Sequence, residues 1–197
     1  MRILKSLLKI FNQFRNKSDN TSDIDEELEK TKILEDFKDT DKIARTILTP
    51  FNFKKNKQHI NTKAVLNKNA FETPPDLDEV SVNRLDYTDS NHLKKLGKII
   101  DIPSDENRNY CGVAIIDVSE IKASDAQIVY SPLYISNENV VNFPNPFHSD
   151  IKIGCIKERG KPLDQEFAYK VSKMVEFCRY YPDPNPSEDE WNGSALI

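Results

Sequence analysis

The ten residues NYCGVAIIDV, positions 109–118, form the most apolar run in the chain and constrain its fold more than any other feature. A short apolar run that contains β-branched side chains and is bounded by polar residues is typical of a buried β-strand. A central strand needs hydrogen-bonded neighbours, because its backbone polar groups cannot be left unpaired in a core. The run therefore predicts a sheet with this strand in its interior.

Two further strands are predicted from the sequence around this run. Residues 79–85, EVSVNRL, alternate apolar and polar side chains, with the two valines inward and Ser81 and Asn83 outward. Residues 126–135, AQIVYSPLYI, form another strand, which Pro132 interrupts or places at an edge of the sheet.

Helices are predicted from helical periodicity and from capping residues. One follows a capping group at residues 88–90 and carries Gly97 in its interior. Another starts near Pro162, which suits a first helical turn. Its apolar face repeats along the chain as Leu163, Phe167, Val171, Met174, Val175 and Cys178. A short helix is expected at residues 42–48, ending before Pro50.

These elements predict an α+β fold: a small mixed or antiparallel sheet of three to five strands, with helices packed on one side. A tethered N-terminal amphipathic helix precedes this domain. The predicted organisation along the chain is an amphipathic basic helix at 1–17, an acidic helical tether at 18–44, the α+β domain at 45–181 and an acidic irregular tail at 182–197. The lone Trp191 in that tail either folds back onto the domain or contacts a partner.

The N-terminal segment has the clearest helical periodicity in the sequence. At 100° per residue its apolar side chains fall on one stripe, and its basic and amide side chains cover the opposite face. The anchors on this apolar stripe are Ile3, Leu4, Leu7, Leu8, Phe11 and Phe14. Because so short a helix is marginal alone in water, the stripe must be covered. Its own core, a groove on another protein and an anionic membrane surface are the three possibilities.

Charge is arranged in blocks that the net charge of −4 conceals. Residues 18–41 carry ten acids against three lysines, whereas residues 51–70 carry five lysines and no acid. In the second block Lys54, Lys55 and Lys57 follow two phenylalanines, a mixture that suits nucleic-acid backbones and stacked bases. A solvated loop pinned by its phenylalanines explains the same block, and the acidity of the whole chain favours that loop.

One short stretch, NPFHSDIKIG at residues 145–154, offers catalytic candidates. A strand at 149–156 puts His148 and Asp150 on one face, where the two side chains can act as a base and its orienting group. Arg84, on another predicted strand, can join them to bind an anion. A small hydrolase or nuclease is therefore conceivable, although phosphate loops and known hydrolase motifs are missing from the sequence. A histidine bonded to the backbone at the end of a strand explains the same pattern, and it is the favoured interpretation, with the active site second.

Cysteine and histidine usage argues against other chemistries. The three cysteines, Cys111, Cys155 and Cys178, form no closely spaced pair, so buried free thiols in a reducing compartment are expected. With three histidines in the chain, neither a metal nor any cofactor is predicted. No apolar run is long enough to cross a membrane. A cytoplasmic location is expected.

A set of short motifs resembles a small uncharacterised bacterial domain. The motifs are Ala70–Phe71, SVNRL at residues 81–85 and NPFHSDIKI at residues 145–153, which is followed by a helix. The resemblance covers about residues 45–180 and implies a domain of unknown activity that occurs among mobile-element and phage-defence genes. Phe147 and Ser149 depart from the pattern, which has smaller residues beside the histidine.

The sequence favours a non-catalytic accessory protein that docks on a larger protein through its N-terminal helix, in a bacterial defence or toxin–antitoxin assembly. Two alternatives are carried forward. One is the hydrolase or nuclease built on His148, Asp150 and Arg84, and the other is a peripheral membrane-surface protein.

Overall fold

The computed structural model describes residues 35–53, 66–101, 109–137, 140–158, 160–161 and 164–197. The chain divides into two compact units, Met1–Asp36 and Phe37–Ile197. The N-terminal helix and most of the acidic tether lie outside the described residues.

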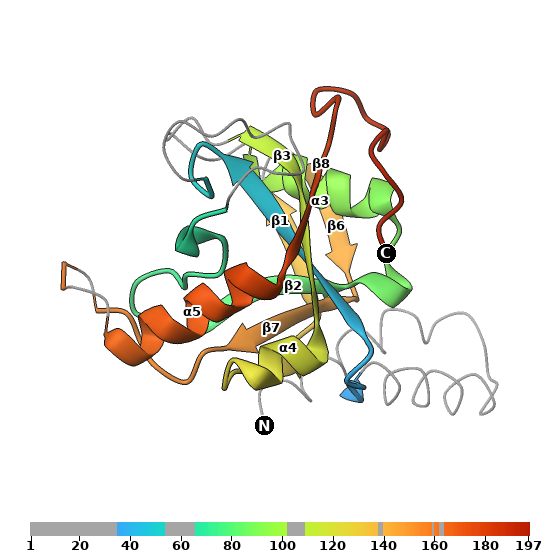
Figure 1. The fold of residues 1–197 in the computed structure, drawn as a ribbon. Coiled ribbons are helices and arrows are strands. Elements are labelled where there is room, and N and C mark those ends of the chain that lie inside the picture. Colours follow the sequence, from blue (N-terminus) through green and yellow to red (C-terminus); the bar gives the residue numbers. More distant parts are fainter. Residues whose placement is uncertain (1–34, 54–65, 102–108, 138–139, 159, 162–163) are drawn as a thin grey trace. The chain divides into compact units, whose positions relative to one another are not determined.

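The second unit is built on a six-stranded antiparallel sheet with strand order β4-β7-β2-β1-β3-β8 (Figure 1). Its strands are β1 (Lys42–Thr49), β2 (Glu79–Arg84), β3 (Asn109–Asp117), β4 (Gln127–Tyr130), β7 (His148–Lys152) and β8 (Arg179–Pro182). A separate two-stranded sheet joins β5 (Leu133–Asn137) to β6 (Val140–Asn145). The helices are α3 (Ser90–Asp101), α4 (Val118–Ala123) and α5 (Gln165–Phe177), with two 3-10 turns, η1 (Lys68–Ala70) and η2 (Leu85–Tyr87). The predicted α+β class is confirmed.

Strand β3 lies inside the sheet, as its apolar sequence predicts, and pairs with β1 on one edge and β8 on the other. The helix expected at residues 42–48 is wrong, because this segment is strand β1, the main partner of β3. Its apolar positions 43, 44, 47 and 48 are spaced as on a helix, although Thr46 is buried with them in the strand. The long antiparallel pairing with β3 decides between these two structures, and the local sequence does not contain that information.

Helices cover both faces of the sheet, so the prediction of helices on one side is wrong. Helices α4 and α5 pack with Ile43, Ile116 and Ile151 in the larger apolar cluster. Helix α3 contributes Leu93 to a second cluster with Ala44, Val113 and Ile115. Ile43 and Ala44 are consecutive on β1, and consecutive strand residues point to opposite faces. The continuous apolar run of β3 is itself the signal for a layer on each side of the sheet, and the one-sided prediction overlooked it.

The helix ends agree with the capping residues in the sequence. Asp89 Oδ1 accepts a hydrogen bond from the His92 N–H at the start of α3, and Asp164 Oδ1 accepts from the Glu166 N–H at the start of α5. Gly97 lies against the ring of Tyr110, where an added Cβ would stand 2.3 Å from Cδ2. The glycine that looks misplaced inside α3 is thus required for the helix to approach β3.

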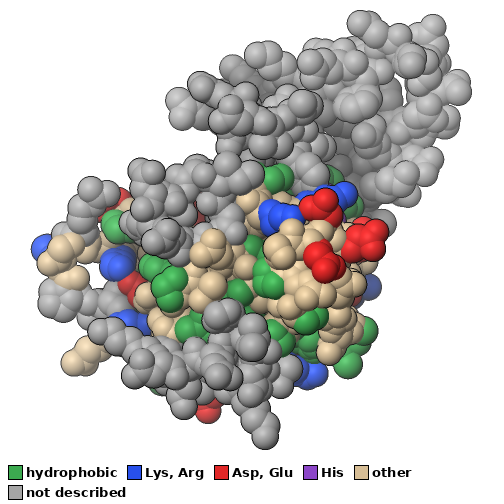
Figure 2. All heavy atoms as spheres, turned by 90° about the horizontal axis from the view of Figure 1, so that it is seen from above, with side chains coloured by type: hydrophobic (Ala, Val, Ile, Leu, Met, Phe, Trp, Pro, Cys, Tyr) green, Lys and Arg blue, Asp and Glu red, His purple; other side chains and the backbone are tan. Residues whose placement is uncertain are grey.

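Residues 183–197, here called the C-terminal strap, follow β8 and fold back onto α3 (Figure 1). Trp191 and Leu196 pack against the second apolar cluster, and the Trp191 N–H donates to Asn91 Oδ1 at 2.7 Å. On the face drawn in Figure 2, acidic side chains gather at one edge beside Lys and Arg side chains. Among the described helices, none is both long and apolar enough to span a membrane.

Candidate functional site

The polar side chains of β7 lie on one face of the strand, as its alternation predicts. His148 pairs with Asn83 of β2, and Asp150 pairs with Ser81 of β2 and Val129 of β4. Ile151 points to the other face and joins the larger apolar cluster. His148 and Asp150 are both buried, with side chains 5% and 10% exposed. The structure therefore brings two of the three catalytic candidates together.

Ser131, between β4 and β5, binds both of these side chains. The Ser131 carbonyl oxygen lies 2.6 Å from His148 Nδ1, and the Ser131 hydroxyl donates to Asp150 Oδ2. Since a carbonyl only accepts, Nδ1 carries the proton of the neutral imidazole. The Nε2 lone pair then faces Asp150 Oδ1 at 3.8 Å. In the described part of the chain, Nε2 is buried and has no hydrogen-bond partner.

Asparagine side chains and an arginine surround this pair. Asn145 Nδ2 donates to Asn83 Oδ1 at 2.7 Å, which explains why Asn83 is buried although alternation places it outward. Arg45 lies where β1 and β2 stop pairing, after Ala44. Its guanidinium donates to the carbonyl oxygens of Ala70 and Ser81. Arg45 thereby replaces part of the backbone pairing that is lost where the two strands diverge.

Burial dominates the ionisation of these groups. It lowers the pKa of His148 below its ordinary value, against raising effects from the Ser131 carbonyl and Asp150, while the positive charge of Arg45 adds to the lowering. Burial also lowers the pKa of Arg45 to about 10, and Asp150 opposes this shift. At neutral pH the site therefore contains a neutral imidazole and a charged guanidinium.

Arg84, the third catalytic candidate, lies away from this pair. Strand alternation turns it to the face opposite Asn83 and His148. There it forms an ion pair with Asp41 at 2.6 Å, and its guanidinium carbon lies 4.5 Å from the ring centre of Phe37 and 4.7 Å from that of Tyr87. Arg84 thus anchors the start of the second unit to β2. The structure does not bring it together with His148 and Asp150.

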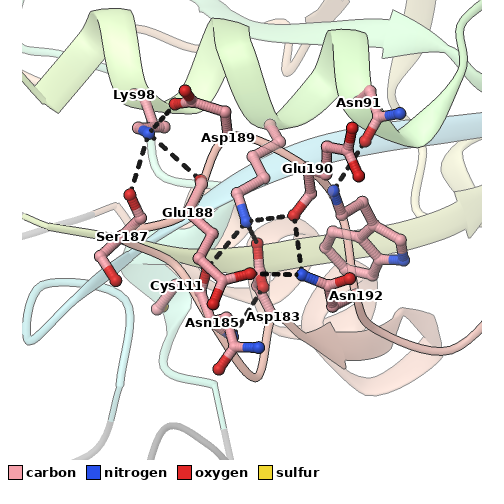
Figure 3. Close-up of polar contacts among 12 residues, drawn as sticks. Asn91, Lys98, Cys111, Asp183, Asn185, Ser187, Glu188, Asp189, Glu190 and Asn192 are labelled. Carbon is pink, nitrogen blue, oxygen red and sulfur yellow. Dashed lines mark hydrogen bonds and ion pairs between the residues drawn. The ribbon is translucent and has the colours of Figure 1, made fainter.

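A second buried polar cluster joins α3 to the C-terminal strap, and sequence reasoning missed it. The Lys94 ammonium lies 2.8 Å from Asp183 Oδ2, and both side chains are fully buried. Lys94 also donates to the carbonyl oxygens of Asn185 and Glu190, at 2.8 and 2.7 Å (Figure 3). Asp183 Oδ1 accepts from the Asn185 N–H. Each charge is therefore matched inside the cluster, as a buried ion requires.

Lys98, one helical turn further along α3, makes the exposed counterpart of this cluster. Its ammonium donates to the carbonyl oxygens of Ser187 and Glu188 and to Asp189 Oδ1 (Figure 3). The acids of the tail and the lysines of α3 were visible in the sequence as charges of opposite sign. Nothing in the sequence, however, indicates which lysine is buried, because both lie on the same helix among other polar residues.

The cysteines are poorly suited to nucleophilic chemistry. Cys111 is buried and donates to the carbonyl oxygen of Ile47. Burial raises the pKa of Cys178 to about 12 and also raises that of Cys155. A thiol with a raised pKa is protonated at neutral pH and reacts slowly. Within the described residues, no three His, Cys, Asp or Glu side chains gather as a metal-binding group.

Two sets of sequence-predicted residues lie outside the described residues. The anchors of the apolar stripe at 1–17 form one set, and Lys54, Lys55 and Lys57 form the other. Comparison of the chain with protein-family models, with curated proteins and with solved structures found no match.

Proposed function

We propose that this chain is a non-catalytic interaction protein that docks on a larger protein through the apolar stripe of residues 1–17. In this proposal the unit Phe37–Ile197 is a self-contained domain carried by that helix. The resemblance to domains among phage-defence genes suggests an effector of a bacterial defence or toxin–antitoxin system as the partner.

The division of the chain between Asp36 and Phe37 is the observation that supports this proposal most. The second unit begins at a firm anchor. Asp41 pairs with Arg84, while Asp39 pairs with Lys122 and its carbonyl accepts from the Ser119 N–H. A second unit that is anchored by its own contacts at its start suits a domain that folds without help from the segment before it.

The polar groups of the second unit also favour a role without catalysis. The Asp41 ion pair holds Arg84 on the face of β2 opposite His148 and Asp150, so the three candidate residues do not meet. A hydrolase or nuclease that used these three residues would need Arg84 on the other face of β2. We therefore rank that alternative below docking, and His148→Ala would test it by its effect on function in cells.

Matched variants of the full chain test the docking proposal. Leu4→Asp with Leu8→Asp places two charges in the apolar stripe, whereas Gln13→Asp with Asn16→Asp makes the same change of charge on the polar face. A tag after Ile197 leaves the helix free. The measurement is quantitative recovery of co-purifying proteins from the native cell, together with the melting temperature of each purified variant.

If the helix docks on a partner, recovery of that partner with the stripe variant should fall at least about tenfold, which corresponds to 1.4 kcal/mol of binding free energy. Recovery with the polar-face variant should be unchanged. Both variants should melt like the parent chain. A lowered melting temperature for the stripe variant alone would instead place the helix in its own core. Loss of sedimentation with anionic vesicles, without loss of any protein partner, would support the membrane-surface alternative.

A further inference from the structure

The pair formed by His148 and Asp150 presents two hydrogen-bond acceptors to each other. With the proton on Nδ1, His148 directs the Nε2 lone pair toward Asp150 Oδ1 at 3.8 Å. The histidine side chain is 95% buried, and within the described residues Nε2 has no hydrogen-bond partner. Two facing acceptors repel unless a positive group lies between them, and burial strengthens the repulsion. The arrangement therefore calls for a cation or a donor between these two atoms.

Ser131 supports both side chains in the way that a metal site requires. Metal-binding histidines donate their second ring N–H to a carbonyl or carboxylate, which fixes the tautomer, and metal-binding carboxylates accept a hydrogen bond on their remaining oxygen. Here the carbonyl of Ser131 accepts from Nδ1 and its hydroxyl donates to Oδ2. One residue thus holds the remote atoms of both groups and leaves Nε2 and Oδ1 facing each other.

A third acceptor lies on the neighbouring asparagine. Asn145 precedes the two-residue turn that leads into His148, and its Nδ2 donates to Asn83, the cross-strand partner of His148. Its Oδ1 is buried and has no hydrogen-bond partner among the described residues. A histidine nitrogen, a carboxylate oxygen and an amide oxygen are a mixed set of the kind that first-row divalent metals accept.

We propose that His148 Nε2 and Asp150 Oδ1 bind a divalent transition-metal ion such as Zn²⁺, with Asn145 Oδ1 and water completing the coordination. Bonds of about 2.0–2.2 Å from zinc to nitrogen and oxygen span up to about 4.2 Å, so the 3.8 Å separation admits an ion. If Nε2 and Oδ1 approached each other by about 0.4 Å, the angle between the two bonds at the zinc ion would be tetrahedral. The sequence does not predict this metal site, because only two of the proposed protein ligands are residues of the usual metal-binding types, one His and one Asp.

The surrounding charges set how strongly this site binds. The carboxylates of Asp150 and Glu79 act on His148 in the sense that favours a cation, whereas Arg45 opposes it. The guanidinium of Arg45 is directed to the carbonyl oxygens of Ala70 and Ser81. The Asp150 side chain is 10% exposed and that of His148 is 5% exposed, so the pair meets solvent only at the Asp150 end, beside the edge strand β4. The site is open to exchange and weaker than a four-ligand structural zinc site.

The chain contains three histidines, so NMR of the full-length ¹⁵N-labelled protein can resolve every imidazole ring. The probe is Zn²⁺ alone, titrated after treatment with a chelator. We expect a saturable shift of His148 Nε2 while Nδ1 keeps its proton. His148→Ala should abolish this binding. His92→Ala, the matched control on α3, should leave the affinity unchanged.

Two milder variants keep the test decisive if His148→Ala fails to fold. Asp150→Asn preserves size and removes the charged ligand, and Ser131→Ala removes the support to Oδ2. Ser131→Ala should weaken Zn²⁺ binding by about 10–100-fold, and Asp150→Asn, which alters a ligand itself, by at least as much, each with a native amide spectrum. An unshifted His148 ring at excess Zn²⁺, or unchanged affinity in Asp150→Asn, would overturn the proposal. So would equal affinity in His148→Ala and the parent chain.

Discussion

The two buried polar clusters lie on the same side of the sheet but differ in how completely their groups are paired. Around Lys94, the ammonium meets Asp183 and two carbonyl oxygens, and the second oxygen of Asp183 accepts a backbone N–H. Around His148, Nε2 and the amide oxygen of Asn145 find no hydrogen-bond partner among the described residues. The first cluster is closed, and the second is open.

This difference distinguishes a structural role from a binding role. A closed cluster fixes the C-terminal strap on α3 and offers nothing to a ligand, because every charge already has a partner. An open cluster leaves acceptors that a ligand can satisfy, at a cost in stability while they stay unpaired. Both clusters consist of buried polar side chains, so burial alone does not distinguish them. They differ in whether each nitrogen and oxygen atom has a hydrogen-bond or ion-pair partner.

The largest effect is expected from Lys94→Met. Removing the ammonium leaves the Asp183 carboxylate buried and without its counter-ion, which costs roughly 3–5 kcal/mol. Chemical denaturation monitored by circular dichroism measures the change. The double variant Lys94→Met/Asp183→Leu should recover part of the loss because no isolated charge remains. A single-variant loss below about 1 kcal/mol would show that the strap cluster is not closed.

Gly97→Ala should destabilise the chain by about 1–3 kcal/mol through overpacking. The new Cβ would meet Tyr110 near the root of its ring, which cannot move away easily in a buried position. The gain of about 0.5–1 kcal/mol from removing a helical glycine is smaller than this cost. Lys95→Ala, an exposed change on the same helix, is the control. An increase in melting temperature for Gly97→Ala would contradict the close packing of α3 on β3.

The open cluster should make the metal-free chain sensitive to acid. Because burial lowers the folded-state pKa of His148, the unfolded chain binds more protons once the pH falls below about 6.5. Stability should therefore decrease as the pH falls through that value, by at most about 1.4 kcal/mol per pH unit for one proton. His92, whose pKa is also lowered by burial, adds to the slope. Urea denaturation at a series of pH values should give a flatter profile for His148→Gln, and an identical profile would refute the assignment.

Lys98→Ala should have the smallest effect on stability. Lys98 is about one-third exposed and its partner Asp189 is almost fully exposed, so solvent screens their attraction. The comparison with Lys94→Met uses the same helix, the same strap and the same denaturation assay. If the two variants lost equal stability, the strap would be held by its exposed contacts and the contrast between buried and exposed lysines would fail.

The sequence predicted the elements whose information is local. The valines of β2, the apolar run of β3 and the apolar face of α5 each specify their element within a few residues. Strand β1 was mistaken for a helix because its apolar residues at 43, 44, 47 and 48 are spaced as on a helix, while its burial depends on pairing with distant strands. The second layer formed by α3 was missed although the continuous apolar run of β3 indicates that both faces of the sheet are covered; what the run does not specify is which helix covers which face.

For the candidate sites, too, the sequence predicted what depends on neighbouring residues and missed what depends on contacts between distant segments. Alternation along β7 placed His148 and Asp150 on one face, and the structure has them so. The alternation could not show that Ser131 lies beside these two side chains, since that contact depends on how β4 pairs with β7. Lys94 had no local indication at all, because its partner Asp183 lies on a segment far along the chain. Contacts of this kind are decided by tertiary structure and not by any window of sequence.

The proposal that the apolar stripe serves a partner is tested most directly by unfolding the chain without residues 1–17. Fully burying each of its large side chains in the protein's own core would contribute roughly 1.5–3 kcal/mol. If the stripe serves a partner, the truncated and full-length proteins should unfold with free energies within about 0.5 kcal/mol of each other, as for a surface change. A loss of several kcal/mol on truncation would place the stripe in the core of the same chain and contradict the docking function.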